Sequence, residues 1–391
     1  MNFDFDTVVD RRNTNSVKWD MLDKIYGVSP DEGIAMWVAD MDFQAPPAVN
    51  ATLKNMADHG IYGYFGNDRA YKASIVSWMQ RRHDWRVEPD WIDTTHGLVN
   101  AISICLQAYT KPGDGVVLFT PVYHAFARMI NANGRKVVES ELVQKEGRYH
   151  MDLEALAAQL TKKDKVVILC SPHNPSGRVW SVEELRALAE FCAEHNLILL
   201  SDEIHNDLVY HGHSHTPMPN AAPEHMDRIA MLTAASKTFN LAGASTVNVI
   251  IQDEKLRAKF AKVNQSLGHG GNLFGMMMTT AAYAYGEEWL DALIEYLDKN
   301  RKIFDAGMNE IPGVKSMNMG ATYLGWVDFA DTGMTREEFT DRVQKQAKVV
   351  PNHGPTFGKG GETFLRFNFA TQRSRLEEAI SRVQDAFSDL Q

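Results

Sequence analysis

Short runs of consecutive apolar residues recur through the middle of the chain, at residues 116–119, 166–170, 197–200 and 229–232. Runs of this length without polar alternation are typical of parallel strands that are buried on both faces of a sheet. The segment between the second and third runs is helix-like. The pattern therefore predicts an α/β fold in which a mostly parallel sheet lies between helices.

The pattern changes near residue 286. Amphipathic helical segments follow, and then strand-like segments at residues 321–329 and 365–369. The last of these alternates apolar with polar residues, which is the mark of a half-buried strand. With 391 residues, the chain is long enough for a large core and a second, smaller domain.

Polar side chains follow three of the apolar runs at the point where each run ends. They are Asn174, Asp202 and Lys237. Each also has an ordinary structural interpretation, as a turn residue, a helix cap or an exposed loop lysine. Because ligands of open α/β sheets collect at the carboxyl ends of the strands, however, we expect the three groups to converge at one edge.

An amine, a carboxylate and an amide at one sheet edge suit pyridoxal phosphate (PLP). Lys237 would form a Schiff base with the cofactor, and Asp202 would partner the pyridinium nitrogen. Asn174 would hydrogen-bond the hydroxyl group of the ring. A further anion site is predicted where the strand at 91–95 leads through Gly97 into a helix that begins near Leu98, because free backbone N–H groups and the positive helix end meet there.

Composition narrows the functional classes. Hydrophobic residues make up 44% of the chain and charged residues 23%, as in soluble globular proteins. The net charge of −10 argues against a nucleic-acid partner. No apolar run approaches the roughly 20 residues of a membrane helix. The acidic first six residues lack the basic and apolar regions of a signal peptide, so we expect a cytoplasmic protein without a membrane partner.

Cysteine and histidine spacing gives no metal site. Cys105, Cys170 and Cys192 form neither a disulfide framework nor a metal-binding pattern, and are expected to be buried thiols. The alternation of histidines over residues 211–215 could place three imidazoles on one side of a strand. Nearby Gly and Pro favour an exposed loop instead, and we predict no metal.

Seven stretches, in order along nearly the whole chain, resemble the MalY/PatB-type cystathionine β-lyases (C–S lyases), which are fold-type I PLP-dependent enzymes of the class I/II aminotransferase superfamily. They are residues 37–43, 62–64, 121–124, 172–180, 201–205, 236–240 and 365–368. The resemblance implies a PLP-binding large domain at residues 46–285 and a small α+β domain made of residues 1–45 and 286–391. It also implies a homodimer that acts on a small-molecule amino acid.

The resemblance also assigns roles around the cofactor. Gly97 and Leu98 would hold the phosphate, with the hydroxyls of Thr233 and Ser236. Tyr123, which could otherwise be a core tyrosine, would stack on the ring. Tyr64, which could otherwise belong to a structural aromatic cluster, would reach the cofactor phosphate of the neighbouring subunit.

Two departures from the aminotransferase pattern favour the lyase. His205 stands where aminotransferases of this fold commonly have a tyrosine that bonds the ring oxygen. Ser245 stands where many of them have a phosphate-binding arginine.

The substrate is expected to bind through Arg366 and the loop that contains Ala39 and Asp40. The planar fork of an arginine suits a bidentate carboxylate, and the resemblance makes Arg366 the anchor of the α-carboxylate. The same resemblance brings the 39–40 loop to that carboxylate through backbone groups. The alternative for Asp40 and Asp42 is a solvated turn.

These assignments give one preferred hypothesis and two rivals. Lys237 takes the α-proton of an L-amino acid, Asp202 keeps the ring nitrogen protonated, and a thiol leaves from Cβ, with pyruvate and ammonia as further products. An aminotransferase shares the early steps and then reprotonates at the cofactor carbon. A PLP-binding transcriptional regulator or non-catalytic partner would need a DNA-binding segment, and none of the sequence is spare.

Overall fold

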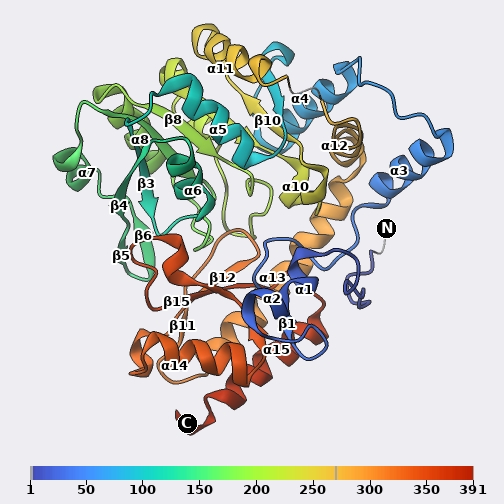
Figure 1. Cartoon of the computed structure of the whole chain (residues 1–391), viewed down its shortest axis with the longest axis vertical. Coiled ribbons are helices and arrows are strands. Elements are labelled where there is room, and N and C mark those ends of the chain that lie inside the picture. Colours follow the sequence, from blue (N-terminus) through green and yellow to red (C-terminus); the bar gives the residue numbers. More distant parts are fainter. Residues whose placement is uncertain (1–2, 269–270, 391) are drawn as a thin grey trace.

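The computed structural model describes residues 3–268 and 271–390. Met1 and Asn2, the start of the acidic stretch considered above, lie outside the described residues. A large sheet with helices on both sides forms one part of the molecule, and a smaller sheet with helices of its own forms the other (Figure 1). Within the described residues, no helix has the length and hydropathy to cross a membrane.

The large sheet has seven strands in the order β2-β10-β9-β8-β7-β3-β4. The strands β3, β4, β7, β8 and β9 are parallel, while β10 runs antiparallel to both of its neighbours. The predicted runs are confirmed as strands. The bounds are β2 Ile92–Thr95, β3 Gly115–Thr120, β4 Lys136–Glu141, β7 Asp164–Cys170, β8 Ile198–Asp202, β9 Ile229–Thr233 and β10 Val247–Ile250.

Burial on both faces explains why these strands lack polar alternation. In β7, Val166 and Ile168 pack into one core cluster, whereas Val167 and Leu169 pack into another on the opposite face. The first face is covered by α5 (Leu98–Tyr109), α6 (Ala125–Ala132) and α11 (Glu254–Ser266), and the second by α7 (Leu153–Gln159), α8 (Val182–Glu194) and α9 (Met218–Ala221).

Further helices and a hairpin surround this layer. A short helix, α10, follows β9 and carries Lys237. The bounds are α3 Pro47–His59, α4 Arg69–His83, α10 Ala235–Thr238, α12 Leu273–Tyr285, β5 Val143–Lys145 and β6 Arg148–His150.

The smaller sheet is antiparallel, in the order β11-β12-β15-β14. The N-terminal segment joins this part of the molecule, because β1 pairs in parallel with β13 (Figure 1). The bounds are α1 Val17–Asp20, α2 Leu22–Tyr26, β1 Ile34–Ala35, α13 Glu287–Asn309, β11 Lys315–Ser316, β12 Leu324–Asp328, α14 Arg336–Asp341, β13 Val349–Val350, β14 Asn352–His353, β15 Phe364–Asn368 and α15 Arg373–Ala386. The domain boundaries stated above stay a prediction.

The expectation that the strand near residue 366 is half-buried is wrong. Every residue of β15 is buried, including Arg366 at 2% exposure and Asn368 at 0%. Leu365 and Phe367 belong to the core, while the polar side chains bond to the backbone of the segment at residues 37–40. The polar alternation marks an interior binding face, and pattern alone does not distinguish such a face from a solvated one.

Candidate active site

A cavity of about 350 Å³ lies at the carboxyl ends of the central strands. It is bounded by elements of the large sheet and by residues from the small-sheet side. It brings together most of the predicted site residues, namely Ala39, Gly97, Leu98, Tyr123, Asn174, Asp202, His205, Ser236, Lys237 and Arg366. Thr233, Asp40 and Tyr64 do not line it.

Lys237 reaches the cavity from α10, directly after β9. The exposed-loop alternative is wrong, because the side chain is partly buried in the cavity wall and the Nζ atom donates a 2.7 Å hydrogen bond to the carbonyl of Ala39. Burial lowers the pKa of Lys237 to about 8, against the opposing effect of the Asp40 carboxylate. A substantial fraction of this amine is therefore neutral near physiological pH, as a nucleophile or a base requires.

Asp202 ends β8 and is 2% exposed. One carboxylate oxygen accepts a 3.2 Å hydrogen bond from the amide of Ile204, and the other lies 3.9 Å from the sulfur of Cys170. Burial raises the pKa of Asp202 to about 7. A buried acid in this position is stabilised as a carboxylate by a ligand that supplies an N–H donor or a positive charge.

Arg366 is held in place by neutral oxygens. The guanidinium donates to Asn174 at 3.0 Å, to the carbonyl of Trp37 at 2.7 Å and to Asn352, and it lies 5.0 Å above the ring of Phe357. Its Nε is buried and has no partner among the described atoms. Burial lowers the pKa of Arg366 to about 10. A buried guanidinium with an unused donor suits an anionic ligand that brings the missing charge.

Another part of the cavity lining offers backbone donors and hydroxyl groups. Gly97 caps α5 with φ of 103°, a conformation that favours glycine, and the first residues of the helix line the cavity. The leading amides of a helix have no partner within the helix and carry its positive end. The surrounding polar residues are Ser236, Ser245 and Thr246. This end can therefore bind a phosphate without an arginine.

Two histidines in the cavity wall are kept neutral by burial. The pKa of His205 lies well below its ordinary value, and burial lowers the pKa of His124 to about 4. The buried Nδ1 atoms of both rings have no partner among the described residues. Tyr123 lines the cavity with these histidines and is also partly buried. A neutral imidazole can donate a hydrogen bond to a ligand or accept one from it.

The loop at residues 37–43 is not a solvated turn. Asp42 is 1% exposed and bonds Lys18 at 3.0 Å and the indole of Trp19 at 3.0 Å. Asp40 accepts two 2.9 Å hydrogen bonds from Arg11. Ala39 presents its carbonyl to the cavity. The solvated-turn alternative fails because the N-terminal segment, which is distant in sequence, supplies cations and an indole to this loop.

Sequence reasoning missed several contributors. Asn352 of β14 orients Arg366, and its local sequence gives no signal of that contact. His124 lies within a stretch that carries the resemblance, but the resemblance assigns no role to it. Arg11, Lys18 and Thr246 have no motif around them. Their neighbours in the site come from other parts of the chain, so only the folded structure reveals them.

Three predicted groups lie elsewhere. Thr233 is fully buried at the end of β9. Tyr64 is fully exposed in the segment between α3 and α4, outside the cavity of its own chain. Asp40 does not line the cavity, although its carboxylate acts electrostatically on Lys237. The roles predicted for these residues stay predictions.

The histidine-rich segment is only partly exposed. His211 and His213 are exposed, but the His215 side chain is only 3% exposed and lies 2.8 Å from a carboxylate oxygen of Glu203, so the exposed-loop expectation is wrong for His215. In the part of the chain that the structure describes, no group of three or more His, Cys, Asp or Glu residues could hold a metal ion. The cysteines are buried and free, as predicted.

Comparison with known proteins places this site in a family. Residues 35–383 match the model of the family "Aminotransferase class I and II". The chain belongs to this family. It is 42% identical over 387 residues to cystathionine beta-lyase PatB of Bacillus subtilis, and the alignment covers 98% of this chain and 100% of the relative. The resemblance inferred from the seven stretches is confirmed.

Solved structures give the same result for the fold. Cystalysin from Treponema denticola, which contains a pyridoxal 5'-phosphate cofactor, has a TM-score of 0.95 and 35% identity, with 100% of both chains covered. A PLP-bound putative aminotransferase from Clostridium difficile has a TM-score of 0.95 and 38% identity, with 99% of this chain and 100% of that chain covered. The predicted fold-type I architecture is confirmed.

Proposed function

We propose that the protein is a PLP-dependent carbon–sulfur β-lyase that acts on cystathionine- or cysteine-type L-amino acids and releases thiol, pyruvate and ammonia. The observation that carries the proposal is the arrangement of Lys237, Asp202 and Arg366 around one cavity, each buried or partly buried. The similarity to a cystathionine beta-lyase over the full length of both chains supports the same reaction.

The residues present fit PLP. The helix end at Gly97 and the hydroxyls of Ser236, Ser245 and Thr246 match a phosphate. Asp202, with a pKa of about 7, matches a protonated ring nitrogen, and the buried, unpartnered Nδ1 of His205 matches a polar ring substituent. When bound, PLP supplies an aldehyde that captures amines and a ring that accepts electrons from Cα.

Each protein group then has a definable task. Arg366 binds the α-carboxylate of the amino acid. Its Nε, which has no partner among the described atoms, supplies a further N–H donor for that carboxylate. The neutral amine of Lys237 takes the proton from Cα. The electrons of that C–H bond form a Cα–Cβ double bond while the C–S bond breaks, and the sulfur leaves with its electron pair as a thiolate that takes up a proton. Hydrolysis of the remaining three-carbon unit gives pyruvate and ammonia.

An aminotransferase is the second candidate, because one solved structure of 38% identity is described as a putative aminotransferase. The two reactions share Lys237, Asp202 and Arg366 and differ in what happens after the α-proton is removed. His205 and Ser245, which depart from the aminotransferase pattern, favour the lyase.

The test offers cystathionine and cysteine to the purified protein without any 2-oxo acid. A lyase releases pyruvate and free thiol in equal amounts over many turnovers. An aminotransferase stops after one turnover and resumes only when a 2-oxo acid is added. If multiple turnovers require the 2-oxo acid and release no thiol, the lyase proposal is wrong and the protein is an aminotransferase.

We also propose that the protein is a cytoplasmic homodimer in which Tyr64 reaches the cofactor phosphate of the second subunit. Tyr64 is fully exposed, and so in part are Tyr62, two residues before it, and Phe274, which packs against Tyr62; this exposed aromatic group supports an interface at this surface. The three free, buried thiols suit a reducing compartment.

A further inference from the structure

The loop at residues 37–43 connects the two halves of the active site through its backbone carbonyls. On one side, the carbonyls of Trp37, Val38 and Asp40 accept hydrogen bonds from Arg366 and Asn368 of β15. On the other side, the carbonyls at positions 39, 41 and 43 accept from Lys237 and from Asn240 just beyond α10. The position of this loop therefore sets the position of the acceptor for the Lys237 amine.

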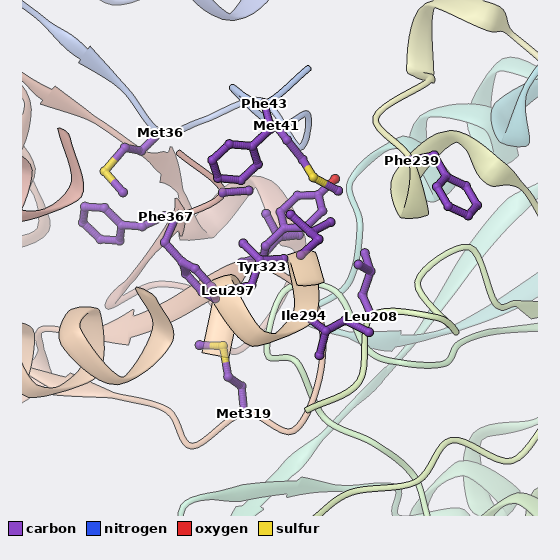
Figure 2. Close-up of a cluster of buried hydrophobic side chains, with 14 of the residues drawn as sticks. Met36, Met41, Phe43, Leu208, Phe239, Ile294, Leu297, Met319, Tyr323 and Phe367 are labelled. Carbon is purple, nitrogen blue, oxygen red and sulfur yellow. The ribbon is translucent and has the colours of Figure 1, made fainter. Parts of the chain in front are cut away.

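Apolar side chains of the buried core anchor the loop at residues 37–43. Figure 2 shows Met41 and Phe43 in the buried cluster with Tyr323 and Leu297. The hydroxyl of Tyr323 donates a 3.0 Å hydrogen bond to the carbonyl of Ala39, which also accepts from Lys237. Packing of Met41 and Phe43 therefore fixes one part of the loop, whereas Asp40 and Asp42 are held by charged residues.

Arg11 holds the charged side of the loop. Its guanidinium makes two 2.9 Å hydrogen bonds to the carboxylate of Asp40, one of 2.9 Å to Asp42 and one of 3.1 Å to the carbonyl of Met41. Lys18 is bound mainly by Asp42, at 3.0 Å, and lies 3.9 Å from Asp40. Arg11 is therefore the principal counterion of Asp40.

We propose that Arg11 is a positioning residue for Lys237. Arg11 acts through Asp40: it neutralises the Asp40 carboxylate and thereby fixes the adjacent Ala39 carbonyl against the lysine amine. The inference rests on the proposed function, in which the free amine of Lys237 takes the α-proton. The hydrogen bond to Ala39 then orients the nitrogen, and leaves its lone pair available to the substrate.

The charges around Lys237 define how Arg11 acts. Groups from four parts of the fold face the lysine. They are Asp40 of the loop, Asp202 at the end of β8 with His205 just beyond it, Tyr323 before β12 and Arg366 of β15. Among these charges, Asp40 opposes the lowering of the lysine pKa most strongly. Removing the guanidinium that balances Asp40 strengthens this opposition, so the pKa of Lys237 rises and less of the amine is neutral.

The test compares Arg11→Gln with Arg12→Gln. Arg12 is the adjacent residue, is also paired with two aspartates (Asp10 and Asp31, each at 2.8 Å), and lies at the surface. Competitive acetylation of the full-length protein without cofactor, followed by mass spectrometry of Lys237, gives the pH midpoint of the amine. We expect about 8 for wild type and Arg12→Gln, and a midpoint higher by about 0.5–1 unit for Arg11→Gln.

A second variant keeps the proposal testable if Arg11→Gln folds poorly. Asp40→Asn removes the carboxylate and leaves Arg11, so the midpoint of Lys237 should fall. The double variant should lose the increase caused by Arg11→Gln alone. In the holoenzyme, the acid limb of the pH profile of kcat, which reports groups in the enzyme–substrate complex, should move in the same directions.

The outcomes separate this inference from the proposed function. An unchanged midpoint in folded Arg11→Gln overturns the role of Arg11, even if the wild type releases pyruvate and thiol. If Arg11→Gln does not fold, an unchanged midpoint in Asp40→Asn overturns it. If the wild type releases neither, the lyase proposal fails, while the acetylation midpoints still decide whether Arg11 acts on Lys237.

Discussion

Burial moves the pKa values of two site residues toward neutrality from opposite sides. Desolvation lowers the pKa of Lys237 to about 8 and raises that of Asp202 to about 7, because in both cases it penalises the charged form. At neutral pH the amine and the acid are therefore both close to their titration points. Residue identity alone would leave a protonated lysine and an ionised aspartate.

Lys237→Ala should retain the fold and lose turnover. The side chain contributes a single hydrogen bond to Ala39, so the thermal midpoint should change little, whereas removal of the base should lower kcat by at least about 100-fold. Pyruvate release and circular dichroism measure the two effects. Lys54→Ala, at an exposed position of α3, serves as the control. Undiminished turnover in Lys237→Ala would refute the assignment.

Asp202→Asn should change how the stability of the cofactor-free protein depends on pH. The folded-state pKa of about 7 exceeds the ordinary value of 3.8, so the folded state binds more protons in that window, and wild-type stability falls as the pH rises from about 4 to 7. The amide of the variant does not titrate in this range. From pH 4 to pH 8, the free energy of unfolding of the variant should therefore rise by roughly 2–4 kcal/mol relative to that of the wild type.

Urea unfolding of both cofactor-free proteins at the two pH values checks this. Parallel pH dependence in wild type and variant would show that Asp202 is already ionised at acidic pH. Saturating PLP should reverse the order of stability at pH 8, because the ring nitrogen supplies the partner that the buried carboxylate otherwise lacks.

At the scale of elements, the site depends on short segments that the strands deliver. Lys237 lies in α10, which has four residues, and the acceptor of its amine lies in an irregular loop. Strand ends and the helix start at Leu98 could be predicted from apolar runs, because burial on both faces leaves a clear pattern. Contacts of the 37–43 loop could not, since its partners come from separate parts of the chain, at residues 11–19, 237–240, 323 and 366–372.

Asn240→Gly tests the link between α10 and this loop. Asn240 donates 2.9 Å hydrogen bonds to the carbonyls of Met41 and Phe43 and accepts one of 2.9 Å from the amide of Met41. Glycine tolerates its φ of 58°, so the substitution removes the bonds without backbone strain. We expect the free energy of unfolding to fall by about 2–4 kcal/mol, and kcat to fall as well.

Asn196→Gly provides the matched control, because Asn196 is exposed and has a φ of 53°. It reports the effect of replacing asparagine by glycine at a left-handed position without the bonds to the loop. Equal losses in the two variants, measured by urea unfolding, would mean that the bonds to the loop contribute nothing.

At the scale of the whole molecule, one exposed residue should belong to a site in a second chain. Tyr64 is fully exposed here, yet the resemblance places it at the phosphate of the neighbouring subunit. Assembly decides this role, and a single chain leaves it open.

Mixing Tyr64→Ala with Lys237→Ala subunits tests the shared site. Each variant alone has two defective sites per dimer. A hybrid dimer combines the intact Lys237 of one chain with the intact Tyr64 of the other, and so restores one site of two. Because half of the dimers are hybrids after equal mixing, lyase activity should reach about a quarter of the wild-type value. No gain over the separate variants, in a sample shown to be dimeric by ultracentrifugation, would place Tyr64 outside the partner's site.

The sequence by itself determined the α/β class, the strands of the parallel sheet and the three polar groups at their ends, because burial and strand direction leave local marks. The strand–glycine–helix pattern added the anion site at Gly97, and family motifs added Tyr123, His205 and Arg366. Tertiary structure alone decided that β15 turns its polar face inward, that Asn352 orients Arg366, and that Arg11 neutralises Asp40 behind Lys237. Those contacts join residues far apart in the chain, and their energies depend on distance and burial, which no local pattern records.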